Sequence, residues 1–468
     1  MKPVVLIKRE KSTKGFITLE IIISLFIITT VISSLFSVFF GSQYFLSDSE
    51  TVGELIYRNR LNLEEARALG YRDIETLVSW REQEEHLEEE LSVKRFYDFS
   101  KEVESRASWN SNFLELSLGL KSFVSDWKQS VGSNTCFRNF KDRSGIEQKG
   151  NLDISENLST DIDVVGERAY ITTDSSSGPN FFIVDVSDPL NPVFVSDNFG
   201  TGKKISSLHI AGRYAYVSTN STAKQIQVVD VFDSSNPNLL TEYKLPDPSS
   251  TTTPTSIFYK DQKIYLGTGK HDGGLEFHLI DVSQPGTPRH LNSWEIDAKV
   301  NDIIIKENFA FLASVNPFPL RIIDLSDYFS EAIKVFVSSP SNDGQAGQNL
   351  SLVNNFLILS RSVFIRVPDY DELVVFDISD LPNPIIKDTF RFGETTRGVV
   401  GRENLLAVAT TWGSENKELQ FFRPDESYEI GLPESHNLSE KPVAIDCEDN
   451  FIYVVTESPS KLIIFEIL

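Results

Sequence analysis

Three residues near the N-terminus, Gly15, Phe16 and Glu20, combine types and spacing that could support chemistry. Glu20 lies just inside a long apolar run, and no charged residue follows it from Ile21 to Ser47. An acidic side chain costs about 2.5–3.5 kcal/mol at the centre of a membrane helix. Opposite charges in a low dielectric are far more stable as a pair than alone. The sequence therefore predicts that Glu20 has a cationic partner.

The apolar run and its basic leader would position these residues. The first fifteen residues carry five positive charges and one negative charge, which favours a cytoplasmic N-terminus. As a helix, residues 16–47 would be about 48 Å long, whereas a bilayer core needs about 20 residues. A secretory signal has a shorter core with a small residue after it, but Gly15 precedes this run. We therefore expect a single-pass membrane protein with an extracytoplasmic remainder. A plain signal-anchor helix with an incidental Glu20 is the alternative.

This arrangement resembles the prepilin leader of type IV pilins and of type II secretion pseudopilins, over roughly residues 11–45. Gly15 matches the residue before the cleavage site, Phe16 the first mature residue and Glu20 the fifth. The resemblance implies cleavage after Gly15 by a prepilin peptidase and N-methylation of Phe16. It also implies that Glu20 neutralises the Phe16 ammonium of a neighbouring subunit during filament assembly. Other pilins or pseudopilins and the inner membrane would be further partners.

The first third of the chain reads as helix followed by a small β region. After Pro3 there is no proline until Pro179, so the turn-rich part begins late. The acidic run at residues 81–90 is typical of a solvated loop or helix face. Residues 102–109 and 114–120 suggest a β-hairpin, because apolar and polar residues alternate after position 113. A helix with a small antiparallel sheet also resembles pilin-like heads.

The remainder of the chain, from about residue 155, is repetitive. Apolar strands end at seven anchor positions, and most are followed by a Ser-Asp or Asn-Pro turn; the anchors are Asp185, Asp230, Asp281, Asp324, Asp377, Phe422 and Glu466. The gaps between anchors are 45, 51, 43, 53, 45 and 44 residues. Each unit has room for four short strands, which is the content of a propeller blade. We expect the five aspartates to be structural, because a carboxylate there can accept amide protons of the turn.

These units resemble the LVIVD-repeat family of β-propellers across residues 155–468. The last unit ends after its third strand, and residues 146–154 could supply the fourth and close the ring. The predicted fold class is mainly β: a seven-bladed β-propeller after a long N-terminal transmembrane helix and a small α+β pilin-like region. The expected divisions are a leader at 1–15, a transmembrane and assembly helix at 16–47, a helix continuation with a β region at 48–145, and the propeller at 146–468. Eight blades or an open ring are the alternatives.

The two cysteines, Cys136 and Cys447, lie just before the closing strand and in the last unit. They could be neighbours in the folded ring, where a disulfide would close a very long loop. Two buried free thiols are the alternative.

Neither the motifs nor the charge points to catalysis or nucleic-acid binding. The formal net charge is −23, and loss of residues 1–15 leaves about −27, whereas nucleic-acid binding needs a basic face. No hydrolase, metalloprotease, phosphate-loop or EF-hand motif occurs, so we expect no enzyme activity, no cofactor and no metal. His271 and His278 form the densest polar cluster, which reads as a solvated turn.

The sequence therefore predicts a minor pilin-like or pseudopilin-like subunit. It would display the propeller on the outside of the cell as a head that binds an unknown extracellular ligand, at the cell surface or on a pilus. A membrane-anchored propeller enzyme or ligand receptor that never assembles is the alternative.

Overall fold

The structure is a computed structural model. It describes residues 28–30, 55–64, 81–84, 87–97, 100–111, 114–125, 145–246, 252–271, 275–315, 317–328, 334–338, 345–362, 371–381, 383–391, 393–402, 405–411, 417–425, 428–438, 440–457 and 459–468. The chain divides into two compact units, one of residues 1–96 and 100–125 and one of residues 97–99 and 126–468.

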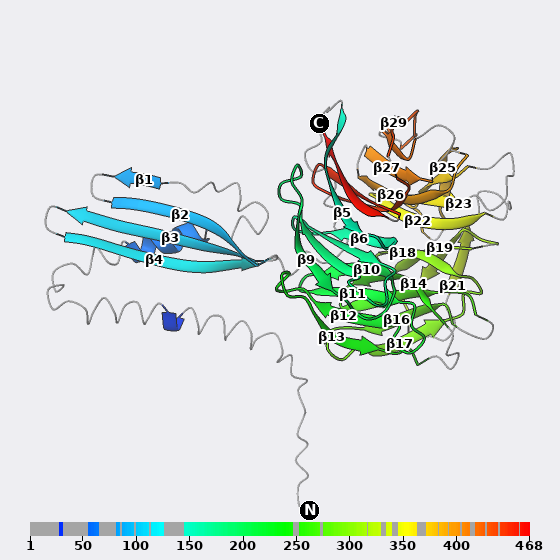
Figure 1. Ribbon diagram of the computed structural model, residues 1–468, viewed down its shortest axis with the longest axis horizontal. Helices are drawn as coiled ribbons and strands as arrows, with labels where there is room; N and C mark the ends of the chain where they lie inside the picture. The colour runs from blue at the N-terminus through cyan, green and yellow to red at the C-terminus, as the bar shows by residue number, and fades with distance from the viewer. Residues whose placement is uncertain are drawn as a thin grey trace, which may run out of the picture. The chain divides into compact units, whose positions relative to one another are not determined.

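The first unit contains a four-stranded antiparallel sheet (Figure 1). Its strands follow one another in the order β1 (Arg81–Glu84), β2 (Leu87–Tyr97), β3 (Ser100–Ser111) and β4 (Leu114–Ser125). Strands β3 and β4 pair from Ser100 with Ser125 to Ser111 with Leu114, which confirms the hairpin predicted from residues 102–120.

A helical segment at residues 55–64 packs on this sheet. Leu55 is buried against Ala107 of β3. Asn59 accepts a hydrogen bond from Ser105 Oγ at 2.7 Å and donates one to the Leu118 carbonyl at 2.9 Å. These contacts join the segment to two strands through both apolar and polar groups.

In the acidic run at residues 81–90, residues 81–84 and 87–90 are strand rather than loop or helix face, so that expectation is wrong for them. Residues 81–84 form β1 and pair with β2. Glu89 turns inward and contacts Arg58 of the helical segment at 3.4 Å. The Arg58 guanidinium therefore pairs with the one carboxylate of the run that points inward, that of Glu89. Side chains alternate along a strand, so the residues next to Glu89 point outward.

The expected membrane helix is corrected by the structure. Among the residues described, no helix is long and apolar enough to cross a membrane. The helical residues are 28–30 and 55–64, and ten residues span about 15 Å against a hydrocarbon core of about 30 Å. Both the long transmembrane helix at 16–47 and the single-pass membrane localisation are therefore overturned. Most of residues 16–47 lie outside the described residues.

The second unit holds seven further four-stranded sheets, here called blades 1 to 7 (Figure 1). Blades 1 to 3 are β6 (Ser159–Val164), β7 (Arg168–Thr173), β8 (Phe181–Asp185), β9 (Val193–Phe199); β10 (Ile205–Ala211), β11 (Tyr214–Thr219), β12 (Ile226–Asp230), β13 (Asn238–Tyr243); and β14 (Pro254–Lys260), β15 (Lys263–Thr268), β16 (Phe277–Asp281), β17 (Arg289–Trp294). Blades 4 and 5 are β18 (Val300–Lys306), β19 (Phe309–Ser314), β20 (Leu320–Asp324), β21 (Lys334–Ser338); and β22 (Ala346–Val353), β23 (Phe356–Ser362), β24 (Leu373–Asp377), β25 (Ile385–Phe390). Blades 6 and 7 are β26 (Thr396–Arg402), β27 (Leu405–Thr410), β28 (Leu419–Phe422), β29 (Glu434–His436); and β30 (Pro442–Glu448), β31 (Phe451–Thr456), β32 (Ser460–Ile467), β5 (Ile146–Ser155).

The first strands of the blades form a closed ring. Each contacts the first strand of the next blade, from β6 through β10, β14, β18, β22 and β26 to β30, and β30 contacts β6 again. Radial four-stranded sheets around one axis make a β-propeller. The fold class is therefore corrected to a mainly β chain of eight small sheets, seven of which form this propeller, without the predicted long helix among the described residues.

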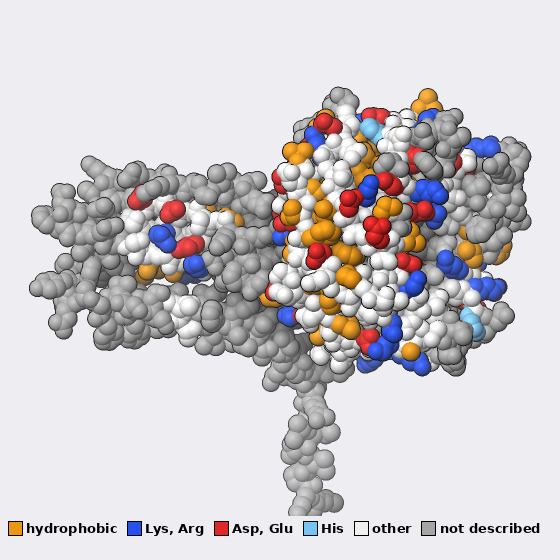
Figure 2. Space-filling model, in the orientation of Figure 1, with side chains coloured by type: hydrophobic (Ala, Val, Ile, Leu, Met, Phe, Trp, Pro, Cys, Tyr) orange, Lys and Arg blue, Asp and Glu red, His pale blue; other side chains and the backbone are white. Residues whose placement is uncertain are grey.

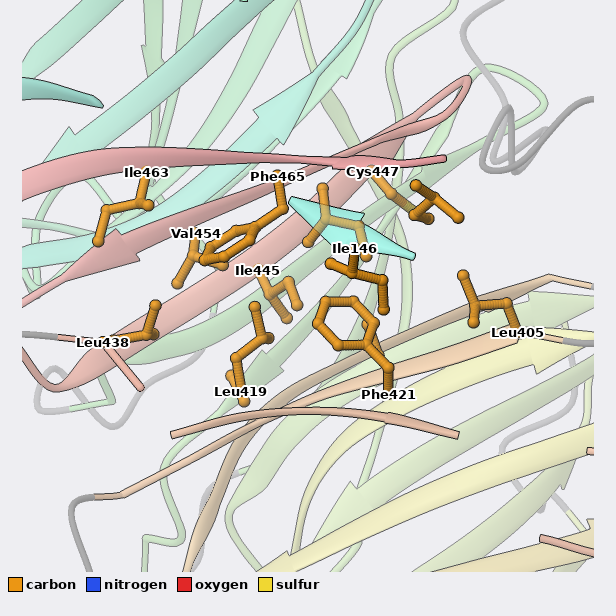
Figure 3. Close-up of a cluster of buried hydrophobic side chains, with 14 residues drawn as sticks. Ile146, Leu405, Leu419, Phe421, Leu438, Ile445, Cys447, Val454, Ile463 and Phe465 are labelled. Atoms are coloured by element: carbon orange, nitrogen blue, oxygen red, sulfur yellow. The ribbon is translucent and has the colours of Figure 1, made fainter. Parts of the chain in front are cut away.

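Strand β5 closes the ring, as predicted for residues 146–154. It pairs antiparallel with β32, from Ser155 opposite Ser460 to Ile146 opposite Ile467. The Ile146 side chain packs in a cluster with Phe421 of blade 6 and Phe465 of blade 7 (Figure 3). The outer strand of the last blade therefore comes from the beginning of the propeller sequence, and it covers the edge of β32 that would otherwise be unpaired.

The local sequence explains these blades. Third strands such as Phe181–Asp185 are apolar without alternation, because neighbouring blades cover both of their faces. The first and second strands of a blade are joined by tight turns whose residues have positive φ. Examples are Gly166 (φ 63°), Glu167 (φ 62°) and Asp261 (φ 49°). Turns of that hand match the twist of the paired strands.

Candidate functional site

The residues with the sharpest predicted roles, Gly15, Phe16 and Glu20, lie outside the described residues, as does Cys136. Their processing, assembly and disulfide roles remain predictions. The five repeat aspartates and Cys447 are described, and the interior of the ring supplies a group of carboxylates that the sequence did not single out.

The five repeat aspartates occupy one position, the last residue of the third strand in blades 1 to 5. Each Oδ1 accepts a hydrogen bond from the backbone amide two residues later, at 2.9–3.0 Å; the pairs are Asp185 with Ser187, Asp230 with Phe232, Asp281 with Ser283, Asp324 with Ser326, and Asp377 with Ser379. This contact closes the turn toward the fourth strand and is a structural role.

Arginines add a second contact in three blades. Asp185 pairs with Arg168, Asp230 with Arg213 and Asp281 with Arg289. Hydrogen bonds from Ser379 hold the pKa of Asp377 below its usual value. Contacts with neighbouring side chains and amides also hold the pKa values of Asp230 and Asp281 below the usual value.

A different set of carboxylates lies on the first strands, inside the ring. Asp161 and Asp163 belong to β6, Asp302 to β18 and Asp446 to β30. Each accepts a backbone amide of the first strand in the next blade. The Oδ2–N distances are 2.9 Å to Leu208, 2.7 Å to Ile210, 2.8 Å to Leu350 and 2.6 Å to Val164, in the same order. These amides lie on the strand edge that no neighbouring strand pairs, so the carboxylates satisfy them.

Burial is the largest influence on the pKa values of these four aspartates. It raises the pKa of Asp161 and Asp163 to about 6 and that of Asp302 to about 7, although the amide hydrogen bonds act in the opposite direction. Burial and the charge of Asp163 raise the pKa of Asp446 well above its usual value. The side chains are half-buried rather than fully covered. Because the amides of the next blade donate to these oxygens, the four carboxylates join neighbouring blades.

A histidine continues this inner layer in blade 2. His209 of β10 stands at the position that Asp163 holds in blade 1, and burial lowers its pKa to about 4. Its ring lies 5.0 Å from that of Phe258, which holds the same position in blade 3. His209 is therefore a neutral ring packed between aromatic groups.

Comparison with known proteins identifies the repeated unit. The model of the family described as LVIVD repeat matches residues 158–198, 202–244, 297–334 and 365–391. These four segments of the chain are similar to the LVIVD repeat. An uncharacterised protein of Methanocaldococcus jannaschii is 28% identical over 119 residues, which are 25% of this chain and 18% of that protein. The chain thus spans less than a fifth of the length of this relative.

Solved structures share the propeller architecture of the second unit. A chain of the mitotic checkpoint complex has a TM-score of 0.53 and 10% identity, over 70% of this chain and 94% of that chain. Virginiamycin B lyase from Staphylococcus aureus has a TM-score of 0.50 and 14% identity, over 69% of this chain and the whole of that chain. At such identities the likeness shows the fold alone.

Blades 1, 2, 3 and 5 share a second polar position that sequence reasoning missed. A buried polar residue five positions before the anchor accepts a backbone amide from the segment after the fourth strand. Asn180 accepts from Thr201, Gln225 from Leu245, Glu276 from Ile296 and Glu372 from Gly393. The fixed spacing from the anchor was the available signal, and the role is again structural.

Cys447 is buried on β30 and is disulfide-bonded. The only other cysteine in the sequence is Cys136. Because that residue lies outside the described part of the chain, its pairing with Cys447 stays a prediction.

The described residues offer no cluster of three or more His, Cys, Asp or Glu side chains that could hold a metal ion. His271 and His278, the polar cluster noted in the sequence, diverge in their contacts: the His271 amide contacts Glu276, whereas the His278 ring contacts Ser293 of the next strand.

Proposed function

We propose that this chain is a recognition protein whose LVIVD propeller is the binding head. The supporting observation is the distribution of exposed aliphatic side chains. They recur at the starts of the outer strands in blades 1, 2 and 5 and on the turn before the outer strand of blade 1, at Leu190, Val193, Leu239, Leu240, Ile385 and Ile386. Figure 2 shows apolar side chains among charged ones on this unit. Exposed apolar surface of this kind favours contact with another molecule.

The interior of the ring supports binding over catalysis. The four inner aspartates use oxygens to dock neighbouring blades, and the five repeat aspartates close turns. Groups with these engagements are poorly placed as nucleophiles or general bases.

We further propose that the N-terminus is a prepilin-like signal that delivers this head to a filament. Gly15 would precede the cleaved bond, Phe16 would become the first residue, and Glu20 would pair with the amine of a neighbouring subunit. Because a seven-bladed propeller is large for a filament subunit, it would be a low-copy subunit among smaller pilins. Long regular filaments formed by the purified chain alone would contradict this.

Co-expression of the full chain with a prepilin peptidase and a major pilin tests the proposal. Intact mass should show a product that begins at Phe16, and Gly15→Val should block it. Gly286→Ala is the matched control, because its added methyl group meets nothing within 4 Å.

Assembly is tested separately. Glu20→Ala should still be cleaved but should no longer co-purify with sheared filaments. Absence of cleavage in the wild type would contradict the prepilin assignment. Normal incorporation of Glu20→Ala would instead favour a receptor or enzyme that does not depend on assembly.

A further inference from the structure

Two imidazole rings in blade 3 converge on a single hydroxyl. His278 Nδ1 lies 2.7 Å from Ser293 Oγ, and His290 Nε2 lies 2.6 Å from the same oxygen. A serine hydroxyl has one proton, so it donates to one ring and accepts from the other. Two ring nitrogens therefore point at one place.

A β-bulge creates this convergence. In a regular strand, His290 and Ser293 would point to opposite faces, because side chains alternate. The pairing of β16 with β17 shifts between Leu279, opposite Asn292, and Ile280, opposite His290, which leaves Leu291 as an extra residue. Because of this extra residue, the His290 side chain lies on the same face of the sheet as that of Ser293. Ser293 is directly opposite His278 on the neighbouring strand.

The rings are held in place yet remain within reach of solvent. The His290 ring forms a hydrogen bond with the backbone of Asn292, and the His290 backbone forms one with the Tyr243 hydroxyl of blade 2. His278 is buried, whereas His290 and Ser293 are half-buried.

The fold itself does not require imidazoles at these positions. Blade 1 has Phe182 and Phe194 at the places of His278 and His290, with ring centroids 6.2 Å apart. Blade 5 has Val374 and Ile386 there. Apolar pairs thus occupy these two positions in blades 1 and 5, so a blade of this fold can pack without imidazoles there.

We infer that His278 and His290 form a binding site for a divalent transition-metal ion of the kind that prefers imidazole, such as Ni²⁺, Cu²⁺ or Zn²⁺. Neutral imidazole is the usual protein ligand of these ions. The metal takes the place between the two ring nitrogens, the Ser293 hydroxyl turns aside, and water completes the coordination. A backbone hydrogen bond to a liganding histidine is the support that such sites normally have.

Isothermal titration of the untagged full chain with Ni²⁺ or Zn²⁺ alone tests the site. The wild type should bind one ion per chain. His290→Leu and His278→Val, which introduce aliphatic side chains as blade 5 has at these positions, should each weaken binding by at least about ten-fold. His436→Gln in blade 6 is the matched control and should bind as the wild type does.

Thermal unfolding of each variant without metal shows whether the blade is intact. If a variant unfolds at a lower temperature, a second experiment uses the wild type instead. In that experiment a histidine-specific reagent acylates the protein with and without Ni²⁺, and peptide mass measures whether Ni²⁺ protects His290. Absence of binding to the wild type would overturn the inference. Equal affinity in the wild type and in both folded variants would also overturn it and leave the cluster as a hydrogen-bond network only.

Discussion

Asp446 Oδ2 accepts a hydrogen bond from the Val164 amide at 2.6 Å, although 282 residues separate them. The contact joins the first strand of blade 7 to that of blade 1. Beside it, Glu448 accepts the amides of Gly166 at 2.6 Å and Glu167 at 2.8 Å. The seam between the ends of the propeller is therefore fastened by carboxylates on its inner side and by β5 on its outer side.

Glu448→Ala should weaken this seam. Both amides would lose a buried acceptor, and an unsatisfied buried group costs about 1–3 kcal/mol. Denaturant unfolding should show a lower free energy of unfolding by about this amount. Glu457→Ala is the control, because its exposed ion pairs with Lys441 and Arg397 are 3.9–4.0 Å long and should contribute little. Equal effects of the two changes would contradict the role of Glu448.

Asp163→Asn should stabilise the propeller at pH 8. The pKa of Asp163 is about 6 in the folded state, against about 3.9 when unfolded, so the folded state holds the proton more tightly. The penalty for the charged form is absent below about pH 4 and complete above about pH 6. The asparagine oxygen can still accept the Ile210 amide. We expect a gain of about 1–3 kcal/mol at pH 8 and little change at pH 4, measured by denaturant unfolding at both pH values.

His209 should have the opposite dependence on pH. Its folded pKa of about 4 lies below the unfolded value of about 6.5, so its contribution to stability is present above pH 6.5. That contribution is lost as the pH falls toward 4, by at most about 1.4 kcal/mol per pH unit. His209→Phe should therefore flatten the loss of melting temperature between pH 6.5 and 4.5. An unchanged slope would show that His209 does not titrate in this range.

The number of blades and the closing strand could be predicted because both follow from sequence patterns that are local and repeated. The apolar strand, the anchor and the turn recur at 43–53 residues, and residues 146–154 stand outside the last complete unit. The inner carboxylates do not recur in this way. Blade 1 has Asp163, but blades 3 and 6 have Phe258 and Val400 at the same position. Their partners lie in the next blade, so their role becomes visible only when the ring is closed.

The predictions for the acidic run and for the histidine cluster were wrong for related reasons. Charge alone suggested that residues 81–90 were solvated, but Glu89 meets Arg58 from a segment that is distant in sequence. His278 was grouped with His271 by proximity in the chain, whereas the bulge at Leu291 brings His290 to it. Both outcomes depend on the register of strand pairs, which composition does not specify.

Gly150→Ala should loosen the outer side of the seam. Glycine is required in β5 because an added Cβ would lie 2.2 Å from the Pro189 carbonyl oxygen and 3.2 Å from Pro192 Cδ in blade 1. Backbone atoms cannot move aside as a side-chain tip can, so the strand must shift, at a cost of about 1–3 kcal/mol.

The distinctive readout of this change is local. Hydrogen exchange of the β5 amides should quicken more than that of strands in blades 3 and 4, because β5 alone would be displaced from β32. Gly286→Ala, where the new methyl group meets nothing within 4 Å, should leave both stability and exchange unchanged. If the two alanine variants exchange alike, the close approach of β5 to the Pro189 turn does not hold the ring shut.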